Sequence, residues 1–222
     1  PHKKIIDYMV AEEKNEPLAS LTLRGFIEEV AARSSAPGGG SASAAIAAIG
    51  TGLGCMVAQL TYGVRKFEHL DKEMRKIIPV LNTATQKLIP MIDADTNAFN
   101  DYMEALKLPK NTDEEKQIRI NKMQDGLKKA VDVPLNTMRL GDSAWEMMLE
   151  IAKYGNIASK SDVEVGARAL EVGIWGAYRN VMINLPGIKD EQFKTEITAI
   201  AEEIRNRAVE KCNEVLNILD NR

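Results

Sequence analysis

Residues 36–67 read APGGGSASAAIAAIGTGLGCMVAQLTYGVRKF, and this stretch decides the fold. No residue from 42 to 62 is charged, and most of them are Ala, Gly, Ser or Thr. Ser41 stands at the position expected of the helix N-cap. Other backbones can approach a helix with such small side chains closely and from several directions. We therefore predict an all-α fold, a multi-helix bundle around this helix as its buried centre.

The glycine turn before this helix is the part of the stretch that is suited to bind a ligand. Glycines expose their N–H groups, and a helix N-terminus carries free donors and a partial positive charge, so a carboxylate or phosphate can bind there. A tight structural turn before a packed helix explains the same residues equally well. A Walker loop is excluded because no Lys follows the glycines, and a dinucleotide fingerprint because no strand precedes them. The candidate contacts are Gly38, Gly39, Gly40 and Ser41.

The same stretch has nearly the length of a membrane span. Its glycines, hydroxyl groups and Gln59 make it only weakly apolar, however, and no second span accompanies it. We therefore predict no transmembrane segment.

The composition narrows the classes of function. The 222 residues, 45% of them hydrophobic, suffice for one sizeable core, so one domain is expected. Charge is nearly balanced, with 29 Lys and Arg against 32 Asp and Glu, and only 5% of the residues are aromatic, which argues against nucleic acid as a partner.

The cysteines and histidines point to no metal site. Cys55 and Cys212 lie in apolar helical patterns without a neighbouring Cys or His at ligand spacing, which indicates buried free thiols in a reducing compartment. His2 and His69 have no supporting motif for a metal site or a Ser-His-Asp triad. We expect a cytoplasmic protein without a bound metal.

The N-terminal part divides at about residue 17. Residues 1–17 have no sustained period and are interpreted as a linker or arm, and the start at Pro1 rather than Met suggests a piece of a longer protein. Residues 18–222 are interpreted as the domain. After Ser20 as N-cap, apolar positions follow one helix face up to Ala31, which predicts a first core helix.

Two aspartates stand out in the long helical pattern from about residue 70 to 108, which Pro79 and Pro90 should kink or break. Asp95 falls on the apolar stripe of this pattern, whereas Asp93 lies about 200° around the helix. A carboxylate that faces a core has a raised pKa or finds a partner, and this is how a general acid or base is made. A salt-bridged Asp at a wet edge is the alternative.

Further helices follow. Thr112 with Glu115 predicts a capping box, Gly155 a helix end, and Asp190 the cap of a last helix. The apolar seam of this last helix packs either within the bundle or against a second subunit.

A second stripe of small residues, from residue 162 to 184, allows close contact with another helix. Its polar members need hydrogen-bond partners, which another helix or a ligand supplies. They are Asp162, Asn180 and Asn184.

Six segments in this order resemble the cyclodeaminase/cyclohydrolase family of folate enzymes. The likeness covers roughly residues 18–220, and it is closest to cyclodeaminase domains of bifunctional chains that also carry formimidoyltransferase domains. The segments are APGGGSASAA (36–45), LTYGVRKF (60–67), IDADTNAF (92–99), LPKNTDEE (108–115), and GNIASKSD (155–162) followed by GAYRNVMINL (176–185).

The resemblance implies a helical homodimer that converts 5-formimino-tetrahydrofolate to 5,10-methenyl-tetrahydrofolate and ammonia, in histidine degradation and one-carbon metabolism. It implies no metal or other cofactor, a polyglutamylated folate as substrate, and formimidoyltransferase domains on the same longer chain. Cytoplasmic localisation is expected, and family members also associate with the Golgi or the centrosome. The alternatives are a methenyltetrahydrofolate cyclohydrolase and a noncatalytic helical dimerisation module.

The resemblance also assigns roles to residues. The family's proton-carrying aspartate corresponds to Asp95, and Asp93 is the reserve candidate. The glutamate tail of a folate would bind at the glycine turn or at Arg65 and Lys66. The pterin would bind the polar groups of the second small-residue stripe. Each of these binding residues also has a purely structural explanation.

Overall fold

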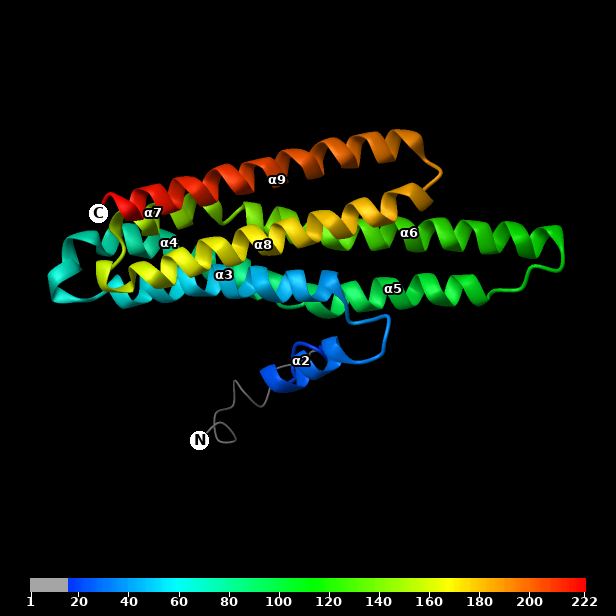
Figure 1. Cartoon of the computed structure of the whole chain (residues 1–222), viewed down its shortest axis with the longest axis horizontal. Coiled ribbons are helices and arrows are strands. Elements are labelled where there is room, and N and C mark those ends of the chain that lie inside the picture. Colours follow the sequence, from blue (N-terminus) through cyan, green and yellow to red (C-terminus); the bar gives the residue numbers. More distant parts are fainter. Residues whose placement is uncertain (1–15) are drawn as a thin grey trace.

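The computed structural model describes residues 16–222, and these form a bundle of helices without any β-strand (Figure 1). The predicted linker lies outside the described residues except for its last two positions. The elements are α2 (Leu23–Ala31), α3 (Gly39–Thr61), η2 (Arg65–Leu70), α4 (Asp71–Leu88), α5 (Met91–Lys107), α6 (Asp113–Asp142), α7 (Trp145–Tyr154), η3 (Ile157–Ser159), α8 (Lys160–Asn184), η4 (Leu185–Gly187) and α9 (Glu191–Asp220).

The α3 helix is the centre of the bundle, as the sequence predicts. It packs against α8, α4 and α5, and its closest approach is to α8, where Gly50 lies on the backbone of Gly166 and Leu170. A Cβ on Gly50 would come within 2.6 Å of the Leu170 nitrogen, so only glycine permits this spacing. Among the described residues, α3 alone is long and apolar enough to cross a membrane, and 61% of its most apolar window is buried inside the bundle.

The predicted start of α3 is wrong by three residues. Gly38 is the N-cap, with extended backbone angles, and Ser41 already lies in the first helical turn. The peptide bond between Ala36 and Pro37 that leads into this turn is cis. As the third residue of the helix, Ser41 has a backbone N–H without an intrahelical acceptor, which can therefore donate to a group outside the helix.

The α2 helix differs from the prediction more strongly. It begins at Leu23, with Thr22 rather than Ser20 as N-cap, and none of its residues is buried. Leu23 is 70% exposed and Ile27 56%, and α2 lies outside the bundle (Figure 1). The prediction of a core helix is therefore wrong, because an amphipathic pattern defines an apolar face but not what covers it.

Of the two prolines expected to kink or break the long helical pattern, only Pro90 falls at a break, as the N-cap of α5. Pro79 lies inside α4 and Pro134 inside α6, and both helices continue through them. The capping box of Thr112 with Glu115, the helix end at Gly155 and the cap at Asp190 are confirmed.

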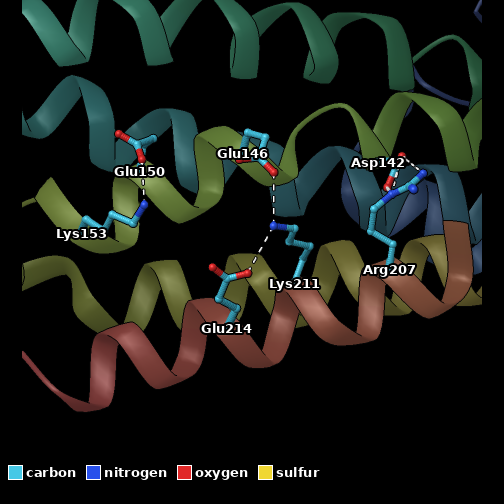
Figure 2. A network of polar contacts seen from close by, with 7 residues as sticks. All are labelled: Asp142, Glu146, Glu150, Lys153, Arg207, Lys211 and Glu214. Carbon is cyan, nitrogen blue, oxygen red and sulfur yellow. Dashed lines mark hydrogen bonds and ion pairs between the residues drawn. The ribbon is translucent and has the colours of Figure 1, made fainter.

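The last helix, α9, packs within the bundle. Its apolar seam is buried against α8, α7 and α6, which decides between the two alternatives that the sequence left open. Ion pairs connect α9 to its neighbours (Figure 2). Arg207 donates to Asp142 of α6 through Nε and Nη2, and Lys211 pairs with Glu146 of α7 and with Glu214 of α9 itself. Figure 2 also shows the pair of Lys153 and Glu150 within α7.

Candidate active site

The carboxylate of Asp95, on α5, lies at the N-terminus of α3. Its Oδ2 accepts hydrogen bonds from the backbone N–H of Ser41, at 2.9 Å, and from the Ser41 hydroxyl, at 3.2 Å. The helix N-terminus therefore does bind a carboxylate, but one supplied by the chain itself. A Cβ on Gly40 would overlap this carboxylate, so the glycine allows the close approach.

The surroundings of Asp95 favour its protonated form. Burial raises the pKa of this carboxyl above its ordinary value, and the two hydrogen bonds from Ser41 oppose the rise. A carboxyl whose pKa is raised toward neutrality can both take and return a proton, which is the property of a general acid-base group.

A cavity of about 360 Å³ opens beside Asp95, within the range of small-molecule sites. Four parts of the chain line it: the glycine turn, α5, α6 and α8. The lining residues are Ser35, Ala36, Gly38, Gly39, Gly40, Asp95, Phe99, Tyr102, Leu127, Ala130, Asn180, Ile183 and Asn184. Larger hollows of about 470 and 630 Å³ contain none of the predicted site residues.

The two asparagines of α8 present acceptors to this cavity. The side-chain amide of Asn180 donates to Gly176 O at 2.8 Å, and that of Asn184 donates to Ala130 O and Asn180 O, both at 3.0 Å. No hydrogen bond to either side-chain oxygen is present among residues 16–222. Asn184 thus uses both of its N–H donors internally and Asn180 one of its two, and each side chain keeps an oxygen that can accept from an N–H group of a ligand.

Asp93 faces another part of the molecule. It is 4% exposed, and its two oxygens accept the N–H groups of Leu18, at 2.7 Å, and Ala19, at 3.0 Å. Asp93 thus ties the segment before α2 to α5. The expected separation of the two aspartates is observed, although Asp93 is the more buried of them.

Three further candidates lie far from the cavity. Arg65 and Lys66 belong to η2, beyond the opposite end of α3, which is about 33 Å long. Asp162 stands in the first turn of α8, about 27 Å along the helix axis from Asn180. Within one chain, these three residues therefore do not line the cavity beside the glycine turn, and their role in binding a substrate stays a prediction.

Comparison with known proteins agrees with this arrangement. The sequence profile described as formiminotransferase-cyclodeaminase matches residues 22–203, which is most of the chain. The chain belongs to the formiminotransferase-cyclodeaminase family. The resemblance seen in the sequence is thereby confirmed.

Two curated relatives show how the formiminotransferase-cyclodeaminase family varies around this domain. The formimidoyltransferase-cyclodeaminase of Dictyostelium discoideum is 52% identical over the whole chain, which spans 41% of that protein's length. The methenyltetrahydrofolate cyclohydrolase of Methylorubrum extorquens is 35% identical over 79% of the chain and 84% of its own length.

A solved structure shows the same fold. The formiminotetrahydrofolate cyclodeaminase of Thermotoga maritima superposes with a TM-score of 0.81 at 27% identity, over 91% of this chain and 97% of its own. The all-α bundle described here is therefore the fold of a cyclodeaminase of this family.

The sequence did not reveal every part of the family's candidate site in this chain. Phe99 and Tyr102 line the cavity from the same face of α5 as Asp95, and their spacing of four and seven residues from it is a signal that identifies them. Leu127 and Ala130 of α6 carry no such signal, because only the packing of α5 on α6 brings them to Asp95. No cluster of three or more potential metal ligands occurs in the described part of the chain.

Proposed function

We propose that this chain is a formimidoyltetrahydrofolate cyclodeaminase domain, which closes 5-formimino-tetrahydrofolate to 5,10-methenyl-tetrahydrofolate and releases ammonia. One observation carries the proposal: a half-buried carboxyl, that of Asp95, is held by one oxygen at the wall of a cavity of suitable size. The similarity to a formiminotetrahydrofolate cyclodeaminase supports the choice of substrate.

With the formimino group in its protonated form, the reaction requires one proton to move between two nitrogens of the substrate. N10 of the folate attacks the formimino carbon and must lose a proton, and the departing nitrogen must gain one before it leaves as ammonia. Asp95 takes the proton from the first nitrogen and returns it to the second, so a single carboxyl group serves both steps. Its raised pKa brings the two protonation states closer in energy.

The cavity also suits the pterin end of a folate. This ring presents amino and ring N–H groups, and the free oxygens of Asn180 and Asn184 accept from such donors. The ring faces of Phe99 and Tyr102 offer apolar contact, and the turn from Gly38 to Gly40 lets the substrate approach the backbone closely.

Purified chain tests the proposal directly. Ammonia release and the absorbance of the methenyl product are measured with wild type, Asp95→Asn and a control, Asp101→Asn, which removes an exposed carboxylate of the same helix. We expect Asp95→Asn to lower turnover by about a hundredfold and Asp101→Asn to leave it unchanged. Wild-type activity in the Asp95→Asn variant would disprove the role of Asp95.

A cyclohydrolase is the second candidate, because the similarity to the Methylorubrum extorquens enzyme covers 79% of the chain. Water attack on the same methenyl carbon would use the same pocket. The initial rates of methenyl hydrolysis and of ammonia release, compared on one preparation, separate the two activities. Faster hydrolysis at equal substrate concentration would favour the cyclohydrolase.

The chain's assembly is a further part of the proposal. We propose a homodimer whose contact is formed by the exposed sides of α3 and α8, two helices that pack along each other. Exposed large apolar side chains gather there, on a protein with almost balanced charge, and a second copy would cover them. They include Ile49, Met56, Leu60, Val165, Val172 and Trp175.

The remaining expectations concern the cellular setting. The chain spans about two fifths of the length of the bifunctional relatives, and we propose that formimidoyltransferase domains accompany it. Two buried free cysteines support a reducing compartment, for which we propose the cytoplasm. Histidine degradation as the pathway and polyglutamylated folate as the preferred substrate follow from the family resemblance alone.

A further inference from the structure

The two carboxyl oxygens of Asp95 have different surroundings. Oδ2 accepts both the backbone N–H and the hydroxyl of Ser41, at 2.9 and 3.2 Å. No hydrogen bond reaches Oδ1 within residues 16–222, and this oxygen lies against Gly40 in the wall of the cavity. One oxygen is therefore held by the protein and the other is left for the substrate.

A second hydroxyl stands behind the first. The Oγ of Ser41, whose side chain is fully buried, is 3.2 Å from the Oγ1 of Thr96. A serine hydroxyl has one hydrogen, so when Ser41 donates to ionised Asp95 the hydrogen of the other contact comes from Thr96. The chain of donors from Thr96 through Ser41 to Asp95 strengthens each of its members.

Neither hydroxyl residue lines the cavity. Ser41 therefore differs from the expectation of the sequence analysis, in which it was a candidate substrate contact. We propose that Ser41 and Thr96 are positioning residues, which hold Oδ2 of Asp95 and confine the exchanging proton to Oδ1. The proposal rests on the catalytic role of Asp95 proposed above.

The backbone N–H of Ser41 is the reason why Oδ1, and not Oδ2, carries the exchanging proton. An N–H group donates only, so a proton placed on Oδ2 would face a fixed donor at 2.9 Å, whereas a proton on Oδ1 meets none. Oδ1 thus forms its O–H bond as the N–H bond of the attacking nitrogen breaks. The same O–H bond then breaks as the departing nitrogen gains its proton, and Ser41 and Thr96 keep their own protons throughout.

Few charged or titratable groups other than the hydroxyls of Ser41 and Thr96 can influence the pKa of Asp95. Among the described residues that line the cavity, Tyr102 of α5 is the only titratable side chain besides Asp95, and those of α3, α6 and α8 are all uncharged. Hydrogen bonds from Ser41 are also the only influences that oppose the effect of burial on the pKa of Asp95. Loss of the hydroxyl therefore acts on Asp95 without another charge to compensate.

The pH dependence of kcat for ammonia release tests the proposal. Ser41→Ala keeps the backbone donor and removes the hydroxyl, so the acid limb of the profile should move up by about one pH unit. Thr96→Val should move it in the same direction by about half as much, and Thr96→Ser should restore the wild-type limb. KM should not change, because neither residue touches the substrate.

Ser43→Ala is the matched control, since Ser43 is a buried serine of the same helix whose hydroxyl donates to Gly39 O instead. Its profile should coincide with that of wild type. An unmoved acid limb in both Ser41→Ala and Thr96→Val overturns the inference, as does a raised KM in Ser41→Ala with an unmoved limb. If Ser41→Ala does not fold, Thr96→Val and its rescue by Thr96→Ser decide.

The Asp95→Asn variant distinguishes the catalytic role of Asp95 from the positioning role of Ser41 and Thr96. If it is inactive while the hydroxyl variants keep the wild-type profile, the proposed function stands and this inference fails. If it is fully active, the catalytic role of Asp95 and this inference fail together, whereas ammonia release by the chain still supports the cyclodeaminase assignment.

Discussion

Gly40 lies directly under the Asp95 carboxylate, so that a Cβ at position 40 would occupy the space of that carboxyl group. The backbone of α3 and the side chain of α5 meet here without an intervening side chain. The contact explains why the glycine turn is needed: it brings the helix N-terminus to the carboxylate and leaves the Ser41 N–H pointing at it.

Gly40→Ala should therefore displace Asp95 and lower kcat by at least about tenfold, since a misplacement of about 1 Å is costly in catalysis. Gly52→Ala is the control, because a Cβ there meets nothing closer than 3.9 Å and an alanine favours the helix. Steady-state ammonia release with both variants checks the prediction. Equal activity of Gly40→Ala and wild type would show that Asp95 is not held as described.

Replacement of Asp95 should also change stability in a pH-dependent way. Because burial raises the pKa of Asp95 in the folded state, the folded protein binds more protons than the unfolded chain between pH 3.8 and the raised value, and stability falls as pH rises through this window. Asp95→Asn removes that loss and keeps an acceptor for Ser41. We expect it to be more stable than wild type at pH 7, with a difference that vanishes below about pH 4.

Thermal unfolding of both proteins from pH 4 to 8 measures this difference. A variant less stable than wild type at pH 7 would contradict the prediction. The same data also provide the folding control for the activity assays.

Asp93 should prove structural. Asp93→Ala leaves the N–H groups of Leu18 and Ala19 without their acceptors, so the segment that carries α2 should come away from α5. Hydrogen exchange of residues 18–31 should rise, with turnover within about threefold of wild type, against the hundredfold loss expected for Asp95→Asn. A comparable loss of turnover in both variants would make Asp93 part of the catalytic machinery.

The proposed dimer contact makes Trp175 a sensitive position. Trp175 of α8 is 52% exposed, and Trp175→Glu places a charge where a second copy would cover an apolar surface. Sedimentation should show a shift from dimer to monomer. Val209→Glu on α9, a residue 40% exposed, is the control and should leave the assembly unchanged.

If the Trp175→Glu protein remains a dimer, the contact lies elsewhere on the surface. If wild type itself sediments as a monomer, the homodimer proposal is wrong for this chain. Both results leave the assignment of the cavity unaffected.

The sequence determined the class of fold and the faces of its helices. An uncharged run of small residues permits close helix packing, and the period of the apolar positions put Asp95 and Asp93 on different sides of α5. Both properties depend only on residues within a few positions of one another, and the structure agrees with them.

The tertiary structure determined which residues distant in the sequence come into contact. Asp95 and Ser41 are 54 positions apart, and only the packing of α5 against α3 brings them together. The sequence grouped Asp162, Arg65 and Lys66 with this site because their types suit a folate, but the rigid lengths of α3 and α8 carry all three to the other end of the bundle. Local periodicity defines a face, whereas the neighbour of that face depends on how the whole chain buries its apolar surface.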